Sequence, residues 1–277
     1  MNLKTLQDWL PPIALRVMRR IASDFRFSMY DRKDILQTNL ELKGRGCGRR
    51  AFIIATGPSL NQEDLTLLVG EDCFTLSNFF LHEDLEIVRP KYHFFAPYHQ
   101  PLILENYIEW LRLADSKLPH STEIVLGHSV LPLVESYQLF TDRNIHFLYL
   151  SENVSMRKVD LLRPVLSPQT GPIMILPFLA YMGYSEVYLL GCDHTVMRDY
   201  GKKVQNFYSE NLESRENATD EKSWRGIIDS HQYSMNVFLQ YRAYRGLFDC
   251  QQVLVKNLSK DSWIDCFPFG ELKEVCQ

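Results

Sequence analysis

Short apolar runs alternate along most of the chain with longer stretches of helical periodicity. The first run, Ala51–Ala55, is too short for a helix and includes two β-branched residues, which favours a buried parallel strand. Similar runs lie at residues 73–76, 92–96, 123–126, 145–150, 186–190 and 252–255. The helical stretches lie between several of these runs, at residues 102–114, 172–183 and 233–248. This alternation predicts an α/β fold with a Rossmann-like, doubly wound and mainly parallel sheet.

The residues Thr56-Gly57-Pro58-Ser59 directly follow the first predicted strand. We expect Gly57 to permit a sharp turn and a close approach to a ligand, and Ser59 to cap a helix that begins there. Free N–H groups and the dipole at a helix start attract anions, so one interpretation is a loop that holds a nucleotide phosphate. The alternative is a turn that uses glycine for its geometry alone.

Three further strand or helix boundaries carry polar residues, and ligands of such sheets bind at the carboxyl ends of the strands. Asn78 offers a donor and an acceptor for a base or ribose, or else serves a turn. Thr170 and Gly171 open an apolar helix, and we expect them to face a phosphate or a sugar carboxylate; the alternative is that Thr170 only caps the helix. Asp193 follows the predicted strand at 186–190, and the carboxyl end of a strand is a common place for a catalytic carboxylate. The role of His194 stays open.

The polar stretch at 198–230, which contains Tyr200, predicts a lid beside the site. His231 follows it, just before a helix that we expect to begin near Ser234. Because an unperturbed histidine has a pKa of about 6.5, His231 could act as a general base at neutral pH. The alternative is a residue that flanks the helix and takes no part in chemistry.

Residues 1–26 combine apolar positions with four arginines, and Pro11 and Pro12 stand where a helix can start. They predict a basic amphipathic helix that lies on an anionic membrane, or that packs on the body or on a second subunit. Residues 27–50 are interpreted as a solvated linker, with a basic phosphate-facing loop as the alternative. We therefore divide the chain into 1–50, the helix and linker, and 51–277, a nucleotide-sugar-binding domain with its lid.

Composition narrows the function further. The net charge of -4 argues against nucleic-acid binding. The six cysteines form no C-x-x-C pair, and no D-x-D is present, so we predict no metal site and no cofactor. No apolar segment resembles a signal peptide or a membrane span, and we expect a cytoplasmic protein.

Four motifs occur in one order: G-P-S-L at Gly57–Leu60, S-N-F-F at Ser77–Phe80, T-G at Thr170–Gly171, and E-V-Y-L-L-G-C-D at Glu186–Asp193. In this order they resemble the metal-independent sialyltransferases that decorate bacterial lipooligosaccharide, and related surface-polysaccharide and motility accessory factor proteins. The resemblance implies a variant of the GT-A fold that transfers an acidic sugar from a CMP donor with inversion. It places the nucleotide-sugar donor at Thr56, Gly57, Pro58, Ser59, Asn78, Thr170 and Gly171, and we also expect Tyr233 to contact the donor.

The chain also departs from that pattern. Thr56 stands where the family has asparagine, and the family's phosphate-binding tyrosine falls on His194 and Thr195, so Tyr200 is the expected substitute. The general-base position falls on Tyr233 without a gap, and on His231 after a shift of two residues. The resemblance also implies a glycan or glycolipid acceptor and a homo-oligomer. We expect the basic helix at residues 1–26 to hold the chain near a lipid-linked acceptor at the inner face of the membrane. Two other functions stay open: a Mg-ATP pterin pyrophosphokinase, and a non-catalytic nucleotide-binding protein of polysaccharide assembly.

Overall fold

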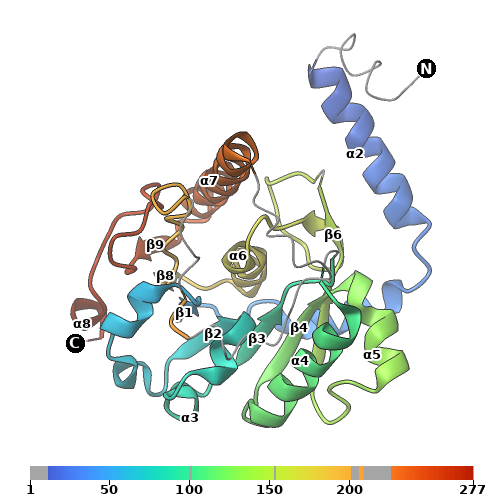
Figure 1. Cartoon of the computed structure of the whole chain (residues 1–277). Coiled ribbons are helices and arrows are strands. Elements are labelled where there is room, and N and C mark those ends of the chain that lie inside the picture. Colours follow the sequence, from blue (N-terminus) through green and yellow to red (C-terminus); the bar gives the residue numbers. More distant parts are fainter. Residues whose placement is uncertain (1–11, 100–101, 153, 201–205, 209–225, 277) are drawn as a thin grey trace.

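One parallel sheet of seven strands organises the chain (Figure 1). The computed structural model describes residues 12–99, 102–152, 154–200, 206–208 and 226–276. Neighbouring strands follow the order β5-β4-β3-β2-β1-β8-β9, and every adjacent pair is parallel. The strands are β1 Arg50–Ile54, β2 Asp72–Leu76, β3 Tyr92–Phe95, β4 Glu123–Gly127, β5 Ile145–Leu148, β8 Glu186–Leu190 and β9 Leu254–Asn257. Strand β9 contains the second half of its predicted apolar run and each of the other six strands contains most of one, which confirms the predicted α/β fold.

Helices connect these strands. The α-helices are α2 Pro12–Ser28, α3 Leu85–Val88, α4 Leu104–Lys117, α5 Leu131–Tyr137, α6 Gly171–Met182, α7 Ile227–Cys250 and α8 Leu272–Val275. Short 3-10 helices are η1 Lys33–Leu42, η2 Pro58–Gln62, η3 Leu65–Leu68, η4 Ser77–Leu81 and η5 His128–Val130. A separate two-stranded parallel pair joins β6 Leu150–Ser151 to β7 Val165–Leu166. Among the described residues, none of the helices combines the length with the apolar run that crossing a bilayer requires.

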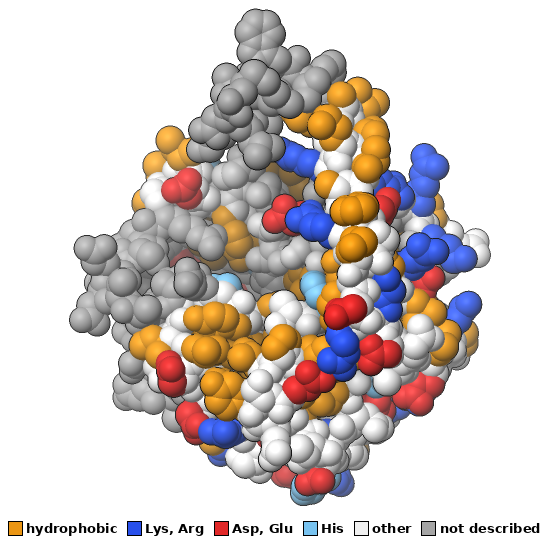
Figure 2. All heavy atoms as spheres, turned by 90° about the vertical axis from the view of Figure 1, so that its right-hand side faces the viewer, with side chains coloured by type: hydrophobic (Ala, Val, Ile, Leu, Met, Phe, Trp, Pro, Cys, Tyr) orange, Lys and Arg blue, Asp and Glu red, His pale blue; other side chains and the backbone are white. Residues whose placement is uncertain are grey.

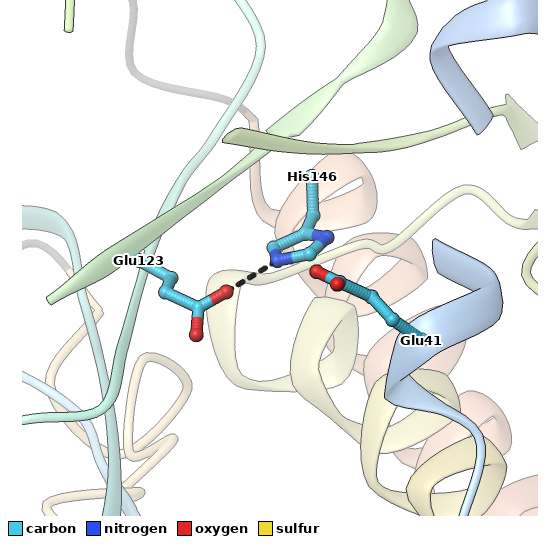
Figure 3. A group of neighbouring side chains, drawn as sticks. All are labelled: Glu41, Glu123 and His146. Carbon is cyan, nitrogen blue, oxygen red and sulfur yellow. Dashed lines mark hydrogen bonds and ion pairs between the residues drawn. The ribbon is translucent and has the colours of Figure 1, made fainter. Parts of the chain in front are cut away.

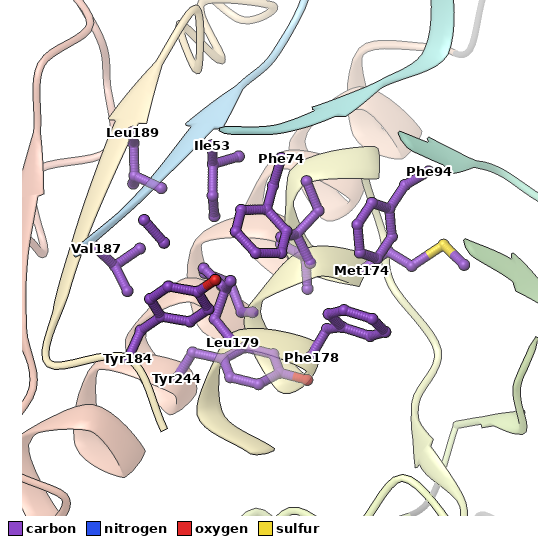
Figure 4. Packing of buried hydrophobic residues seen from close by; sticks show 14 of the residues in the cluster. Ile53, Phe74, Phe94, Met174, Phe178, Leu179, Tyr184, Val187, Leu189 and Tyr244 are labelled. Atoms are coloured by element: carbon purple, nitrogen blue, oxygen red, sulfur yellow. The ribbon is translucent and has the colours of Figure 1, made fainter. Parts of the chain in front are cut away.

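The two faces of the sheet bury two separate apolar layers, because successive side chains of a strand point to opposite faces. On β1, Ile53 packs with α6 and α7 (Figure 4), whereas Phe52 and Ile54 pack with α4 and α5 on the other face. Helix α6 is buried almost all round, which explains its nearly uniform apolar sequence. The sheet is therefore doubly wound, with helices on both faces (Figure 1).

The direction of winding reverses beside β1. From β1 the chain adds β2, β3, β4 and β5 on one side, and it then returns to place β8 on the other side of β1. Ligands of open α/β sheets bind at this kind of reversal, outside the carboxyl ends of the strands. The carboxyl ends of β1 and β8 are therefore the first place to look for a site.

Four local expectations differ from the structure. Lys33–Leu42, expected in a solvated linker, forms η1, and its Leu36, Asn39 and Leu42 are buried. Helix α7 begins at Ile227, so His231 lies within the helix and not before it. No α-helix follows Gly57: η2 and η3 occupy this stretch as two short 3-10 helices. The predicted lid lies mostly outside the described residues, and its last residues, 227–230, belong to α7.

Candidate functional site

The loops after β1 and β8 meet directly at the reversal. Gly57 N donates a hydrogen bond to Gly191 O at 2.9 Å. A Cβ added to Gly57 would lie 2.4 Å from that oxygen and 2.6 Å from Asp193 Oδ2. Gly57 has an extended backbone, with φ -66° and ψ 154°, so the expected sharp glycine turn is not found. Glycine is required here because two loops leave no room for a side chain.

Asp193 holds the Gly57 loop from the other strand. Its Oδ2 accepts a hydrogen bond from Ser59 N at 2.9 Å, and its Oδ1 accepts one from the Ser59 hydroxyl. Burial raises the pKa of Asp193, and the two bonds from Ser59 oppose that rise. Ser59 makes no side-chain cap, and its amide is bonded to this carboxylate instead of facing outward. These contacts favour a positioning role for Asp193, and the catalytic role stays a prediction.

Asn78 lies just after β2, the strand that pairs with β1. Its side chain is fully buried, and its Oδ1 accepts a hydrogen bond from Trp110 Nε1 at 2.5 Å. The preceding Ser77 has a left-handed φ of 54°, and His93 Nε2 bonds to its carbonyl at 3.0 Å. As placed here, Asn78 anchors the turn and has no exposed surface for a nucleobase.

Thr170 and Gly171 bring the start of α6 to the same edge. Thr170 occupies the predicted N-cap position but makes no side-chain capping bond. Gly171 lies against the end of β2, because an added Cβ would come within 2.5 Å of Leu76 Cδ1. The first backbone amides of α6 are thus fixed beside the residues that follow β2.

Helix α7 packs on the loop before Thr170. The Tyr233 hydroxyl donates to Gln169 O at 3.0 Å, and Gln169 N donates to the side chain of Gln240 at 2.9 Å. His231 is exposed, and its Nδ1 donates to Ile227 O at 2.8 Å. That bond leaves the lone pair of the neutral ring on Nε2, the form that a general base needs.

The two remaining predicted residues, His194 and Tyr200, differ in solvent exposure. His194 is largely buried, and burial lowers its pKa to about 4. Its Nε2 contacts the Tyr241 hydroxyl of α7 at 3.0 Å, which ties α7 to the end of β8. Tyr200 is 41% exposed at the end of the turn that follows Asp193, and its role stays a prediction.

One contact was not anticipated from the sequence. Phe207 N donates to Thr56 O at 3.1 Å, and the Phe207 ring lies 4.9 Å from the ring of His82 and 6.2 Å from that of Phe79. Phe207 and Tyr208 are an aromatic pair within an otherwise polar stretch, and this was the available signal. Phe207, from the predicted lid, therefore lies against the Gly57 loop.

One group of side chains has the chemistry of a metal site. Ligand atoms of Glu41, Glu123 and His146 lie within 4.8 Å of one another (Figure 3). His146 Nε2 bonds to Glu123 at 2.6 Å, and Arg45 pairs with Glu123 at 3.5 Å and with Glu41 at 3.4 Å. Because Arg45 already pairs with both carboxylates, the contacts fit an ion-pair network better than a cation site. The group lies at the amino ends of β4 and β5, away from the Gly57 loop.

Comparisons with known proteins gave a distant structural likeness. No protein-family model matches the chain, and no curated protein matches it. One similar solved structure is the sialyltransferase CstII from Campylobacter jejuni in complex with the substrate analogue CMP-3FNeuAc, at 15% identity and a TM-score of 0.43. Another is the same enzyme with cytidine-5'-monophosphate, at 16% identity and a TM-score of 0.41. Both matches cover 80% of this chain and 85% of the other.

Proposed function

We propose that this chain is a glycosyltransferase that moves an acidic sugar from a CMP donor to a glycan acceptor without a metal ion. One observation carries the proposal: the four sequence motifs converge at one edge of the sheet. Gly57 contacts Gly191 and Asp193, and Gly171 contacts Leu76 next to the S-N-F-F motif. Three of the motifs lie at the carboxyl ends of the adjacent strands β2, β1 and β8, and the fourth begins α6, although they span more than a hundred residues of sequence.

In the proposed reaction the start of α6 and the Gly57 loop hold the donor. The hydroxyl groups of the half-buried Thr56 and Thr170, together with the dipole at the start of α6, stabilise the negative charge on the donor phosphate. The amides of Gly57 and Ser59 are already bonded within the site, and Pro58 has no N–H. The acceptor hydroxyl oxygen attacks the anomeric carbon while His231 Nε2 takes its proton. The bond between that carbon and the phosphate oxygen breaks, and CMP leaves with the electron pair. Tyr200 is the candidate donor to the leaving phosphate.

Donor binding is tested first by thermal unfolding with CMP, CDP, UDP, GDP and ATP, each with and without magnesium. A ligand at one hundred times its dissociation constant stabilises the folded chain by about 2.7 kcal/mol. We expect stabilisation by CMP that does not require magnesium. Stabilisation by magnesium-ATP alone would replace the proposal with a kinase. A chain that binds CMP but releases none from any CMP-sugar would be a non-catalytic binding protein.

The general base is tested by His231→Gln, with Met235→Gln as the matched control, since both residues are exposed on α7. We expect His231→Gln to lower kcat for CMP release by about 10²–10⁴-fold while CMP binding stays unchanged. The control should keep full activity. Unchanged turnover in His231→Gln would remove the base assignment, and Tyr233→Phe would then be measured in the same assay.

A further inference from the structure

Helix α2 packs on the body through the face that carries Ser23. Ser23 is buried and shares a hydrogen bond of 2.5 Å with Ser151. One turn later, the Phe27 ring lies 4.9 Å from the ring of Tyr149, and Tyr30 lies 5.1 Å from the same ring. Ser23, Phe27 and Tyr30 are spaced by three and four residues, so they form the inner face of the segment.

The opposite face of α2 is apolar and points away from the body. Ile13, Val17, Ile21 and Phe25 follow a spacing of four residues and are 67%, 53%, 63% and 64% exposed. Figure 2 shows hydrophobic side chains along this helix on its outward side. An amphipathic helix normally buries its apolar face against the core, and here that face has the reverse orientation. The exposed stripe is continuous, which is typical of a surface that contacts another molecule.

Basic side chains border this stripe. Arg19, Arg20 and Arg26 are exposed, and the helix carries four arginines against one acidic residue, Asp24. At 3.6 residues per turn, Arg20 falls on the Ile13 side of the stripe, and Arg19 and Arg26 fall on its other side beyond Met18. Cations on both borders of an apolar face match an anionic lipid surface, in which the apolar residues enter the acyl boundary and the arginines meet the headgroups.

We propose that α2 binds the chain to an anionic lipid surface through Ile13, Val17, Ile21 and Phe25. The inner face of α2 contacts Tyr149 and Ser151, which follow β5, and Tyr30 also lies 5.5 Å from His128, which follows β4. In a parallel sheet these carboxyl ends share one edge with those of β1 and β8. The lipid-binding helix and the candidate site therefore lie at the same edge of the sheet.

The test is cosedimentation of the full-length chain with two kinds of vesicle, one of phosphatidylcholine alone and one of phosphatidylcholine mixed with phosphatidylglycerol. The full chain should bind the anionic vesicles more tightly, and added salt should weaken that binding. Ile21→Ser should weaken binding about tenfold or more, because burial of an isoleucine side chain is lost. Arg20→Gln should weaken binding to the anionic vesicles by about fivefold.

Val69→Ser is the matched control, since Val69 is 66% exposed at the end of η3, and it should bind as the unchanged chain does. Equal loss in Val69→Ser, or no binding to either vesicle, would overturn the proposal. Sedimentation velocity tests the alternative that a second copy of the chain covers this face. If the chain bound no vesicles and formed a dimer that Ile21→Ser dissociated, the face would be a dimer interface. Vesicle binding needs no donor sugar, so its failure is distinguishable from failure of the proposed transferase activity.

Discussion

At the scale of single residues, Gly57 and Gly246 differ in whether the surrounding atoms leave room for a side chain. A Cβ at Gly57 would meet Gly191 O at 2.4 Å, whereas a Cβ at Gly246, within α7, would meet nothing within 4 Å. We expect Gly57→Ala to lower the free energy of unfolding by about 1–3 kcal/mol through overpacking. Gly246→Ala should raise it by about 0.5–1 kcal/mol, because alanine favours helix. Urea unfolding of both variants measures the difference, and equal effects would contradict the close approach of the two loops.

The bond between Asp193 and Ser59 makes a second prediction at this scale. Hydrogen bonds to a charged group contribute about 1.5–3 kcal/mol each, and Ser59 makes two of them to one carboxylate. Asp193→Asn and Ser59→Ala should therefore destabilise the chain non-additively in a double-mutant cycle. If Asp193 positions the loop, Asp193→Asn should also weaken CMP binding. Loss of turnover with unchanged CMP binding would instead favour a catalytic Asp193.

At the scale of elements, η1 illustrates a helix that belongs to the core although its sequence is polar. Asn39 is fully buried, and its Nδ2 donates to Phe147 O at 2.8 Å and to Leu161 O at 3.1 Å. Asn39→Ala would leave both carbonyls without this donor, and we expect a loss of about 1–3 kcal/mol in the free energy of unfolding. Gln37→Ala, on the exposed side of η1, should stay within about 0.5 kcal/mol of the unchanged chain. Similar values for both variants would show that η1 is dispensable.

The elements of the sheet were predictable because buried parallel strands are short apolar runs bounded by polar residues. The same search missed η1, since only Leu36, Asn39 and Leu42 mark it and their spacing of three is that of a 3-10 helix. It also placed the start of α7 too late, because four consecutive polar residues, Asp229–Gln232, interrupt the helical pattern of apolar positions. Local patterns therefore recover strands better than irregular or polar helices.

The site was predictable in its position but not in its contacts. The rule that ligands bind at carboxyl ends selects the residues around Gly57, Gly171 and Asp193. The pairing of Ser59 with Asp193 joins residues separated by 134 positions, and no pattern within one segment encodes it. The burial of Asn78 under Trp110 is likewise a tertiary contact, and an asparagine in sequence does not reveal it.

At the scale of the whole molecule, the buried His93 and the partly buried His194 couple folding to pH. Burial lowers the pKa of His93 to about 3 and that of His194 to about 4. His93 is enclosed by Thr75 and the Ser77 carbonyl, and His194 by Tyr241. Both rings are neutral in the folded chain at pH values where the unfolded chain, with a histidine pKa of about 6.5, is protonated.

The sign of the effect follows from which state binds more protons. Between about pH 6.5 and pH 4 the unfolded chain binds protons at both histidines and the folded chain does not, so stability falls as pH falls. Each histidine contributes a slope of up to about 1.4 kcal/mol per pH unit. Asp193 acts in the opposite direction, since its raised pKa lets the folded state take up a proton more readily near its own titration.

His194→Asn isolates one of these contributions, because asparagine tolerates the left-handed φ of 50° at this position. Urea unfolding across the interval from about pH 6.5 to pH 4 should show a shallower slope for the variant, by up to about 1.4 kcal/mol per pH unit. An unchanged slope would mean that His194 is protonated in the folded chain and that water reaches the contact with Tyr241. In that case the end of β8 would be open to solvent, and the contact between His194 and Tyr241 would not hold α7 against the end of β8.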